Sequence, residues 1–153
     1  MKTLLVISYA PSPNTLILQT SVIQGANSID LAQTKVRLLS PFKANAKDVI
    51  AADGIILGTP ENLGYMSGAL KDFFDRCYYD CLEKTQGKPC ASFIRAGHDG
   101  TGTVKALKTI TTGLKWRWAQ EPLVLQGKYH SEFENQCFEL GAAMACALDQ
   151  GII

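Results

Sequence analysis

Residues 54–76 constrain the fold more than any other part of the chain, because their pattern changes twice within a short stretch. Gly54–Gly58 is a short apolar run between two glycines, which is typical of a strand buried on both faces. From Ser67 onward, apolar residues such as Leu70 and Phe73 recur at the spacing of a helix with one buried face. A buried strand, a loop and an amphipathic helix make half of a βαβ unit. The stretch therefore predicts an α/β fold.

The segment between this strand and this helix, residues 59–66, is predicted to be a loop. Pro60 and Gly64 are both unfavourable in regular elements. The segment is also longer than the roughly two to six residues of most βα connections. In parallel α/β sheets, ligands bind at the loops that follow the carboxyl ends of the strands. The length of this loop therefore favours a ligand site over an ordinary connection.

The rest of the chain alternates between the same two patterns. Apolar or alternating runs predict strands, and runs with helical spacing predict helices. The expected strands are 3–8, 34–39, 90–94 and 122–125, the last with an alternative start near Trp118, and the expected helices are 15–25, 46–52, one after Gly102 and one after Ser131. Asn45 is the expected N-cap of the helix at 46–52, and Ser131 with Glu134 has the pattern of a capping box.

The polarity of each strand predicts its place in the sheet. Residues 3–8 are apolar throughout, as in the centre of a parallel sheet, whereas residues 34–39 alternate between polar and apolar, as at an edge. This predicts a flavodoxin-like three-layer sandwich, in which a five-stranded parallel sheet of order 2-1-3-4-5 carries helices on both faces. The loops after the first, third and fourth strands then lie side by side at one end of the sheet.

Composition limits the class of protein. The 153 residues are the length of one domain, so we expect residues 1–153 to fold as a single unit. A formal net charge of +1 argues against a nucleic-acid partner, which requires many positive charges. No apolar run is long enough to span a membrane. The five cysteines form no CxxC pair and no metal-binding frame, which indicates buried thiols in a reducing cytoplasm and no metal site.

The first of the three loops is rich in neutral hydrogen-bonding groups. Ser8, Ser12, Asn14 and Thr15 stand just before or at the start of a predicted helix. Backbone N–H groups and the positive end of a helix favour a phosphate group at such a position. The same residue types are common in an ordinary helix cap. The loop therefore predicts either a phosphate site that uses neutral donors or a cap without a ligand.

The second and third loops suit a flat ring. The residues expected to line such a ring in the second loop, mainly through backbone N–H groups, are Pro60, Glu61, Asn62, Leu63, Gly64 and Tyr65. In the third loop, residues 97–102, the glycines allow a flat ligand to approach the backbone closely. Gly97, His98 and Gly100 are the expected contacts there, although a lone histidine in such a loop is more often a surface residue.

Residues 58–76, with the sequence GTPENLGYMSGALKDFFDR, resemble the signature of the flavodoxin-like NAD(P)H-dependent FMN and quinone reductases. The Gly-Thr-Pro strand end, the Met-Ser-Gly turn and the Leu-Lys-x-Phe-x-Asp-Arg helix carry the likeness. Residues 12–15, Ser-Pro-Asn-Thr, resemble the Thr-Gly-Asn-Thr phosphate loop of flavodoxins, and residues 96–100 resemble the third flavin loop of the family. Pro13 stands where a flavodoxin has glycine, which removes one amide donor.

The resemblance implies non-covalent FMN. Its phosphate would lie on Ser8, Ser12, Pro13, Asn14 and Thr15, its ring along Pro60, Glu61, Asn62, Leu63, Gly64 and Tyr65, and its pyrimidine side against Gly97, His98 and Gly100. The resemblance further implies a cytoplasmic oxidoreductase, usually a homodimer. Such an enzyme passes hydride from NADH or NADPH through the flavin to a quinone, a free flavin or a similar small-molecule electron acceptor. It implies no dedicated catalytic acid or base.

Other readings of the sequence stay open. A flavodoxin-type electron carrier is the main alternative, but a carrier typically encloses its flavin between two aromatic rings, and these loops offer only Tyr65, with Tyr9 nearby. A fold relative without flavin is a third reading. Residues 8–15 contain no acidic cluster, cysteine or arginine, which argues against a receiver domain and against a low-molecular-weight phosphatase. Trp116 and Trp118 predict either core packing or contact in a homodimer.

Overall fold

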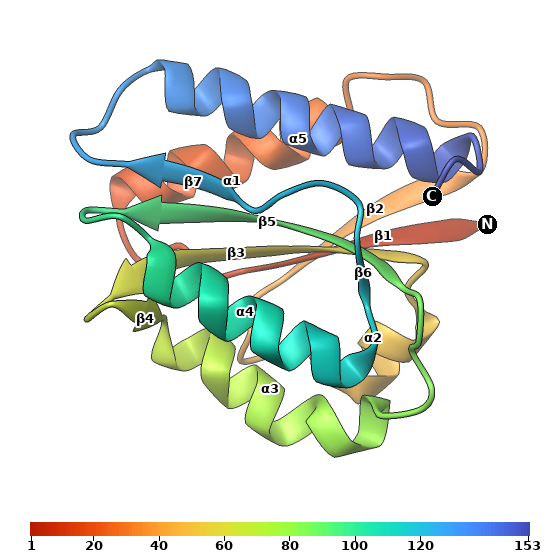
Figure 1. Cartoon of the computed structure of the whole chain (residues 1–153). Coiled ribbons are helices and arrows are strands. Elements are labelled where there is room, and N and C mark those ends of the chain that lie inside the picture. The colour runs from red at the N-terminus through yellow and green to blue at the C-terminus, as the bar shows by residue number, and fades with distance from the viewer.

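The computed structural model describes residues 1–153 as three layers around one sheet (Figure 1). The strands are β1 (Lys2–Ser8), β2 (Thr34–Leu39), β3 (Gly54–Asn62), β4 (Tyr65–Met66), β5 (Pro89–Ala96), β6 (Arg117–Trp118) and β7 (Leu123–Gln126). Helices α1 (Pro13–Ala26) and α5 (Glu132–Asp149) cover one face, and α2 (Ala46–Ala51), α3 (Gly68–Cys81) and α4 (Thr101–Leu114) cover the other. None of these helices has the length and apolarity that crossing a membrane requires.

The predicted strand order and parallel pairing are confirmed. The sheet runs β2-β1-β3-β5, and both β6 and β7 continue it beyond β5 in parallel. The alternating strand β2 lies at the edge, as its polarity predicts. The fifth strand is divided into β6 and β7, and the alternative start near Trp118 corresponds to β6. Pro122 lies in the interruption, where its missing N–H removes no ladder hydrogen bond.

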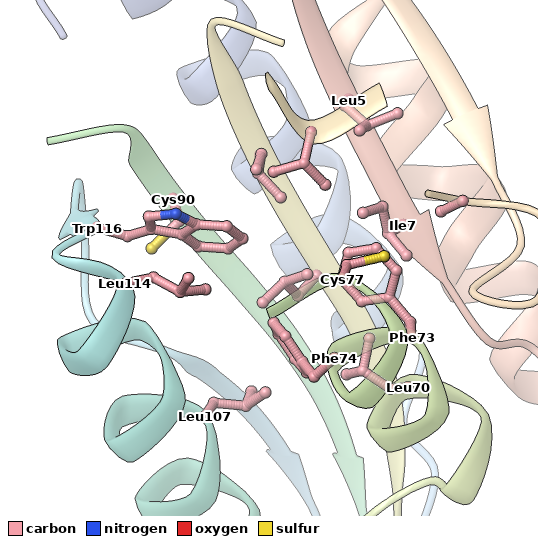
Figure 2. Close-up of a cluster of buried hydrophobic side chains, with 14 of the residues drawn as sticks. Leu5, Ile7, Leu70, Phe73, Phe74, Cys77, Cys90, Leu107, Leu114 and Trp116 are labelled. Atoms are coloured by element: carbon pink, nitrogen blue, oxygen red, sulfur yellow. The ribbon is translucent and has the colours of Figure 1, made fainter. Parts of the chain in front are cut away.

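Alternating side chains of the central strands fill two separate cores. Leu5 and Ile7 of β1 belong to the core under α2, α3 and α4, whereas Leu4 and Val6 belong to the core under α1 and α5. Figure 2 shows the first of these cores, to which α3 and α4 contribute Leu70, Phe73, Phe74, Cys77, Leu107 and Leu114. Strands with apolar residues on both faces are thus buried on both faces, as the sequence predicts.

The two tryptophans belong to the core beside α4. Trp116 is buried, and its indole N–H donates a hydrogen bond of 2.8 Å to the hydroxyl of Thr85. The indole N–H of Trp118, which is partly buried, donates to the hydroxyl of Thr111 at 3.0 Å. Buried tryptophan usually finds such a partner for its N–H. The core-packing interpretation of these residues is therefore confirmed.

Four of the five cysteines are buried, and Cys146 is partly buried. Burial raises the pKa of the Cys90 thiol to about 12 and that of the Cys137 thiol to about 12. A buried thiol with a raised pKa is a poor nucleophile and behaves as a small apolar side chain. These residues are part of the packing, as predicted.

Two local predictions are wrong. Residues 59–66 are not an irregular loop, because β3 continues to Asn62 and then pairs with β4 as an antiparallel hairpin. Strand β1 has already ended at the level of Pro60, so the missing N–H of this proline leaves no partner unpaired. Ser131 makes no capping hydrogen bond, because its backbone is already helical rather than extended. Glu134 instead accepts a hydrogen bond from the Tyr129 hydroxyl at 3.1 Å.

Helices α1 and α5 approach each other through two glycines. A Cβ atom on Gly25 of α1 would lie 1.9 Å from the carbonyl oxygen of Phe138, and one on Gly141 of α5 would lie 2.0 Å from that of Val22. Both distances are far below van der Waals contact. The backbones of the two helices can therefore approach this closely only where a side chain is absent.

We expect Gly141→Ala to lower the free energy of unfolding by about 1–3 kcal/mol, because the added methyl group forces the two helix backbones apart. Gly68→Ala is the matched control, because no atom lies within 4 Å of a Cβ at that helical position. This control should leave stability unchanged or raise it by up to about 1 kcal/mol. Urea denaturation of the three proteins checks the prediction, and equal stability of the two variants would contradict it.

Candidate functional site

The three loops that the sequence singles out lie at one end of the sheet. The register pairs Ser8 of β1 with Gly58 of β3 and Gly58 with Phe93 of β5, so these strands end close together. The N–H of Tyr9, the first residue after β1, donates to the Gly58 carbonyl at 3.0 Å. Chain segments that are far apart in the sequence therefore meet at the carboxyl edge, where such folds bind ligands.

Gly58 lies beneath the loops, where side chains of the two neighbouring strands pack over it. A Cβ atom there would lie 2.3 Å from the Cζ atom of Phe93 and 2.6 Å from the Oγ atom of Ser8. The Phe93 ring and the Ser8 hydroxyl therefore occupy the space that a side chain at position 58 would fill. The sequence identified Gly58 only as the end of a strand, and the role of Phe93 beneath the loops was missed because residue contacts across strands depend on register.

The first loop contains a complete helix cap. Ser12 is the N-cap of α1, and its hydroxyl accepts the N–H of Thr15 at 3.2 Å. The Thr15 hydroxyl accepts the N–H of Ser12 at 3.0 Å, and the two hydroxyl oxygens lie 2.8 Å apart. Helix α1 thus begins at Pro13, earlier than predicted. The predicted cap is present, and a ligand at this loop would bind to the groups that the cap leaves available.

The hydrogen-bonding groups at the start of α1 that the cap does not use suit an anion. The first turn of α1 contains no acidic residue, and Ser12, Pro13 and Asn14 are exposed. The N–H and the side-chain amide of Asn14 lie at the positive end of the helix, where a phosphate is stabilised by the helix dipole. Ser8, in contrast, is buried below the loop. The donor set fits a phosphate group that is bound by neutral donors, among them the exposed side chain of Asn14.

The second loop is the hairpin between β3 and β4. Thr59 fixes its base, because the Thr59 hydroxyl accepts the N–H of Ser67 at 3.0 Å and donates to the Pro60 carbonyl at 2.8 Å. The turn consists of Leu63 and Gly64, whose φ angles are 53° and 75°. Such pairs of positive φ angles occur in tight hairpin turns, where glycine is favoured and leucine is not. Leu63 is thus a strained residue at the tip of this hairpin, and its side chain is fully exposed.

The third loop is tied to the second by one carboxylate. Glu61 accepts the N–H of His98 at 3.1 Å and the N–H of Gly100 at 2.8 Å, one on each carboxylate oxygen. Gly100 has a φ angle of 72°, and a Cβ there would lie 2.7 Å from Val124. The sequence predicted Glu61 as a ring contact through its backbone. Its side chain, in addition, holds residues 97–100 against the hairpin, which spacing alone could not show.

The side chains of the third loop point into solvent. His98 has 89% of its side chain exposed, and its Nε2 atom lies 4.0 Å from the carboxylate of Asp99. The N–H and the hydroxyl of Thr101 donate to Asp99, and these bonds lower the pKa of its carboxyl group. A Cβ on Gly97 would meet no atom within 4 Å, so the backbone there is open to a ligand. Helix α4 begins at Thr101, which shortens the predicted loop.

Residues 26–131 match the family of NADPH-dependent FMN reductases. The chain belongs to this family. The matched range includes the hairpin and the third loop, and it begins after the first loop. The match agrees with the resemblance noted from the sequence, and FMN is the cofactor of the flavodoxin-like proteins of this family.

A flavodoxin of Aquifex aeolicus is 35% identical to the chain over 114 residues, which are 74% of this chain and 60% of that protein. The match thus spans less than two thirds of that relative. Among solved structures, an archaeal flavodoxin has a TM-score of 0.78 at 20% identity, with 97% of this chain and 99% of that chain covered. The WrbA-like protein of Agrobacterium tumefaciens has a TM-score of 0.74 at 19% identity, with 98% and 99% covered. These structures confirm the flavodoxin-like fold.

An NADH:FMN oxidoreductase in its apo form is also similar in structure. Its TM-score is 0.73 at 14% identity, with 96% of this chain and 90% of that chain covered. Flavodoxins and reductases thus share this fold at comparable structural similarity. The fold alone does not distinguish a carrier from an enzyme.

We expect Glu61→Ala to release residues 97–100 from the hairpin. Hydrogen bonds to a charged acceptor contribute about 1.5–3 kcal/mol, so hydrogen exchange of the His98 and Gly100 amides should accelerate by at least about tenfold. Glu121→Ala is the matched control, because Glu121 pairs with Lys108 on α4 and makes no bond to these amides. Amide exchange followed by NMR checks the prediction. Unchanged exchange at both amides in Glu61→Ala would contradict it.

Proposed function

We propose that the chain transfers hydride from NADH or NADPH, by way of bound FMN, to a quinone, a free flavin or a similar small acceptor. The match of residues 26–131 to the NADPH-dependent FMN reductases carries this proposal. When bound, FMN supplies the redox chemistry, and the protein supplies binding and orientation. No dedicated acid or base is assigned, because the titratable side chains of the third loop, His98 and Asp99, are both exposed.

The first loop is proposed to hold the phosphate of FMN. The N–H and amide of Asn14 and the hydroxyl of Ser12 would donate to it, at the end of α1 that favours an anion. Thr15 would act through the cap that orients Ser12. Ser8 lies buried beneath the loop, and Pro13 has no N–H to donate, so both would contribute shape rather than exposed donors.

The second and third loops are proposed to line the flavin ring. Residues 60–65 would contact it mainly through the backbone of the hairpin, and Gly97, His98 and Gly100 would close its pyrimidine side. The Glu61 bonds to the N–H groups of His98 and Gly100 support this assignment, because they hold both loops in one fixed arrangement. Positioning by groups that are already ordered costs less conformational entropy on binding.

Access to the ring supports a reductase. A hydride donor and an acceptor must both reach the flavin, so one of its faces has to stay uncovered. Tyr9 is engaged elsewhere, because its ring packs edge-to-face against Phe42 with centroids 6.1 Å apart. Tyr65 is then the single aromatic residue of these loops without such a partner. The arrangement supports an open ring face more than an enclosed one.

A flavodoxin-type electron carrier is the second candidate. The 35% identity with a flavodoxin of Aquifex aeolicus favours it. A carrier would bind FMN in the same loops but would accept electrons from a partner protein instead of from NAD(P)H. The homodimer that the family resemblance implies stays a prediction for either candidate.

We expect the FMN-loaded protein to be reduced by NADPH or NADH in anaerobic stopped-flow experiments, with loss of flavin absorbance near its oxidised maximum. Addition of a quinone such as menadione should restore the oxidised spectrum, because the acceptor then removes the electrons. A flavin that NAD(P)H leaves oxidised, but that a flavodoxin reductase reduces, would support the carrier instead. A protein that binds no FMN would contradict both candidates.

We expect Asn14→Ala to weaken FMN binding by roughly tenfold or more, because one hydrogen bond to a charged phosphate contributes about 1.5–3 kcal/mol. Asn27→Ala is the matched control, since Asn27 lies at the other end of the same helix. Quenching of FMN fluorescence during titration measures both affinities. Equal affinity of Asn14→Ala and Asn27→Ala would remove the first loop as the phosphate site.

A further inference from the structure

A groove of about 370 Å³ lies beside the second and third loops, between the β3–β4 hairpin and helices α3 and α4. We call it the hairpin groove. Its walls include Gly64 and Tyr65 of the hairpin, Lys71 of α3, and Lys105 and Thr109 of α4. The hairpin proposed to line the flavin ring therefore forms one wall of this groove, while the other walls belong to helices α3 and α4.

The chemistry of the hairpin groove suits a phosphorylated nucleotide. Tyr65 is 39% exposed and offers an aromatic ring, and such rings stack on bases. Lys71 and Lys105 offer two ammonium groups, and Thr109 offers a hydroxyl. No aspartate or glutamate lines the groove. An aromatic face beside cationic side chains is the combination that binds a base together with its phosphate.

Among the lysines of these two helices near the groove, Lys105 is the one without a carboxylate partner. Lys71 donates to Asp75, and Lys108 pairs with Glu121 at 2.9 Å. No carboxylate lies within ion-pair distance of Lys105, and α4 itself contains no acidic residue. Lys105 is therefore the unpaired positive charge that an anion in the hairpin groove would contact.

The position of Lys105 matches a ligand that begins at the flavin loops. Lys105 follows the N-cap Gly100 by five residues, or about 7.5 Å along the helix axis. The hairpin is held tightly against this helix, because a Cβ on Gly102 would lie 1.9 Å from the Gly64 carbonyl oxygen. The groove is thus a fixed extension of the flavin loops and not a separate surface.

A second groove, of about 700 Å³, lies on the other side of Lys105 and is less suited to an anion. Its wall includes the carboxylate of Asp99, whose pKa is lowered by the N–H and then the hydroxyl of Thr101, so it carries a negative charge at neutral pH. Its second lysine, Lys108, is paired with Glu121. It also lacks an aromatic residue. The hairpin groove is therefore the better site for a nucleotide phosphate.

We propose that the hairpin groove binds the adenosine half of the pyridine nucleotide, with Lys105 on a phosphate group and Tyr65 against the adenine. This inference rests on the proposed reductase function, in which the nicotinamide half of the same molecule reaches the flavin. The phosphate on Lys105 is either the 2′-phosphate of NADPH or the pyrophosphate that NADH and NADPH share.

Calorimetric titration of the FMN-loaded protein with NADP⁺ and with NAD⁺ tests this site without turnover. Lys105→Met keeps a helix-forming side chain of similar length and should weaken NADP⁺ binding by about tenfold or more. Lys108→Met is the matched control on the same helix and should change the affinity by less than about twofold, because its charge is already paired. FMN affinity should be the same in all three proteins.

The two dinucleotides identify which phosphate Lys105 binds. Loss of affinity for NADP⁺ alone indicates the 2′-phosphate, and equal loss for both indicates the pyrophosphate; either result supports the site. Tyr65→Leu should weaken both, because the adenine is common to them. If Lys105→Met binds both nucleotides like the unmodified protein, while that protein still oxidises NADPH, the hairpin groove is wrong and the reductase function stands. If the unmodified protein neither binds nor oxidises either nucleotide, the reductase function itself is wrong.

Discussion

The burial of β3 on both faces is the constraint on which the rest of the structure depends. Ile55, Ile56 and Leu57 are all inaccessible to solvent, so every N–H and C=O group between them must be paired within the sheet. Pairing with β1 and β5 in parallel requires crossover connections, and those connections place helices on both faces. Because the parallel strands then end at the same edge, the loops that follow them meet there. The site is a consequence of this arrangement.

Pairing between β3 and β1 ends at Gly58, and the residues of the candidate site in β3 follow that glycine. Beyond it, β3 is free to turn back on β4, and the Glu61 carboxylate binds two N–H groups of the third loop. The second and third loops therefore form one unit. The first loop is ordered separately, by the mutual cap of Ser12 and Thr15. A ligand that contacts all three loops would therefore bind both to the unit formed by the second and third loops and to the separately ordered first loop.

The main strands and the helices could be predicted because they depend on local periodicity, and the sheet order could be predicted from the polarity of each strand. The cap at Asn45, for example, follows from residue type and position, and Asp48 completes it in the structure. The hairpin could not be predicted. Pro60 and Gly64 indicate a break in regular structure, and only the positions of the neighbouring strands show that a strand can continue through Pro60. The bonds of Glu61 also depend on a contact between residues far apart in the sequence. Contacts of that kind follow from register, which periodicity specifies only in part.

Phosphate binding at the start of α1 would replace one hydrogen bond of the cap with a stronger one. The Thr15 hydroxyl donates to the Ser12 carbonyl, so its single proton is committed and the proton between the two hydroxyls belongs to Ser12. Turning that proton toward a phosphate would exchange a neutral bond, which contributes about 0.5–1.5 kcal/mol, for a charge-assisted one of about 1.5–3 kcal/mol. The bond from the Thr15 N–H to Ser12 stays intact in this exchange. The cap therefore orients Ser12 before binding and would give up only the bond between the two hydroxyl groups to the ligand.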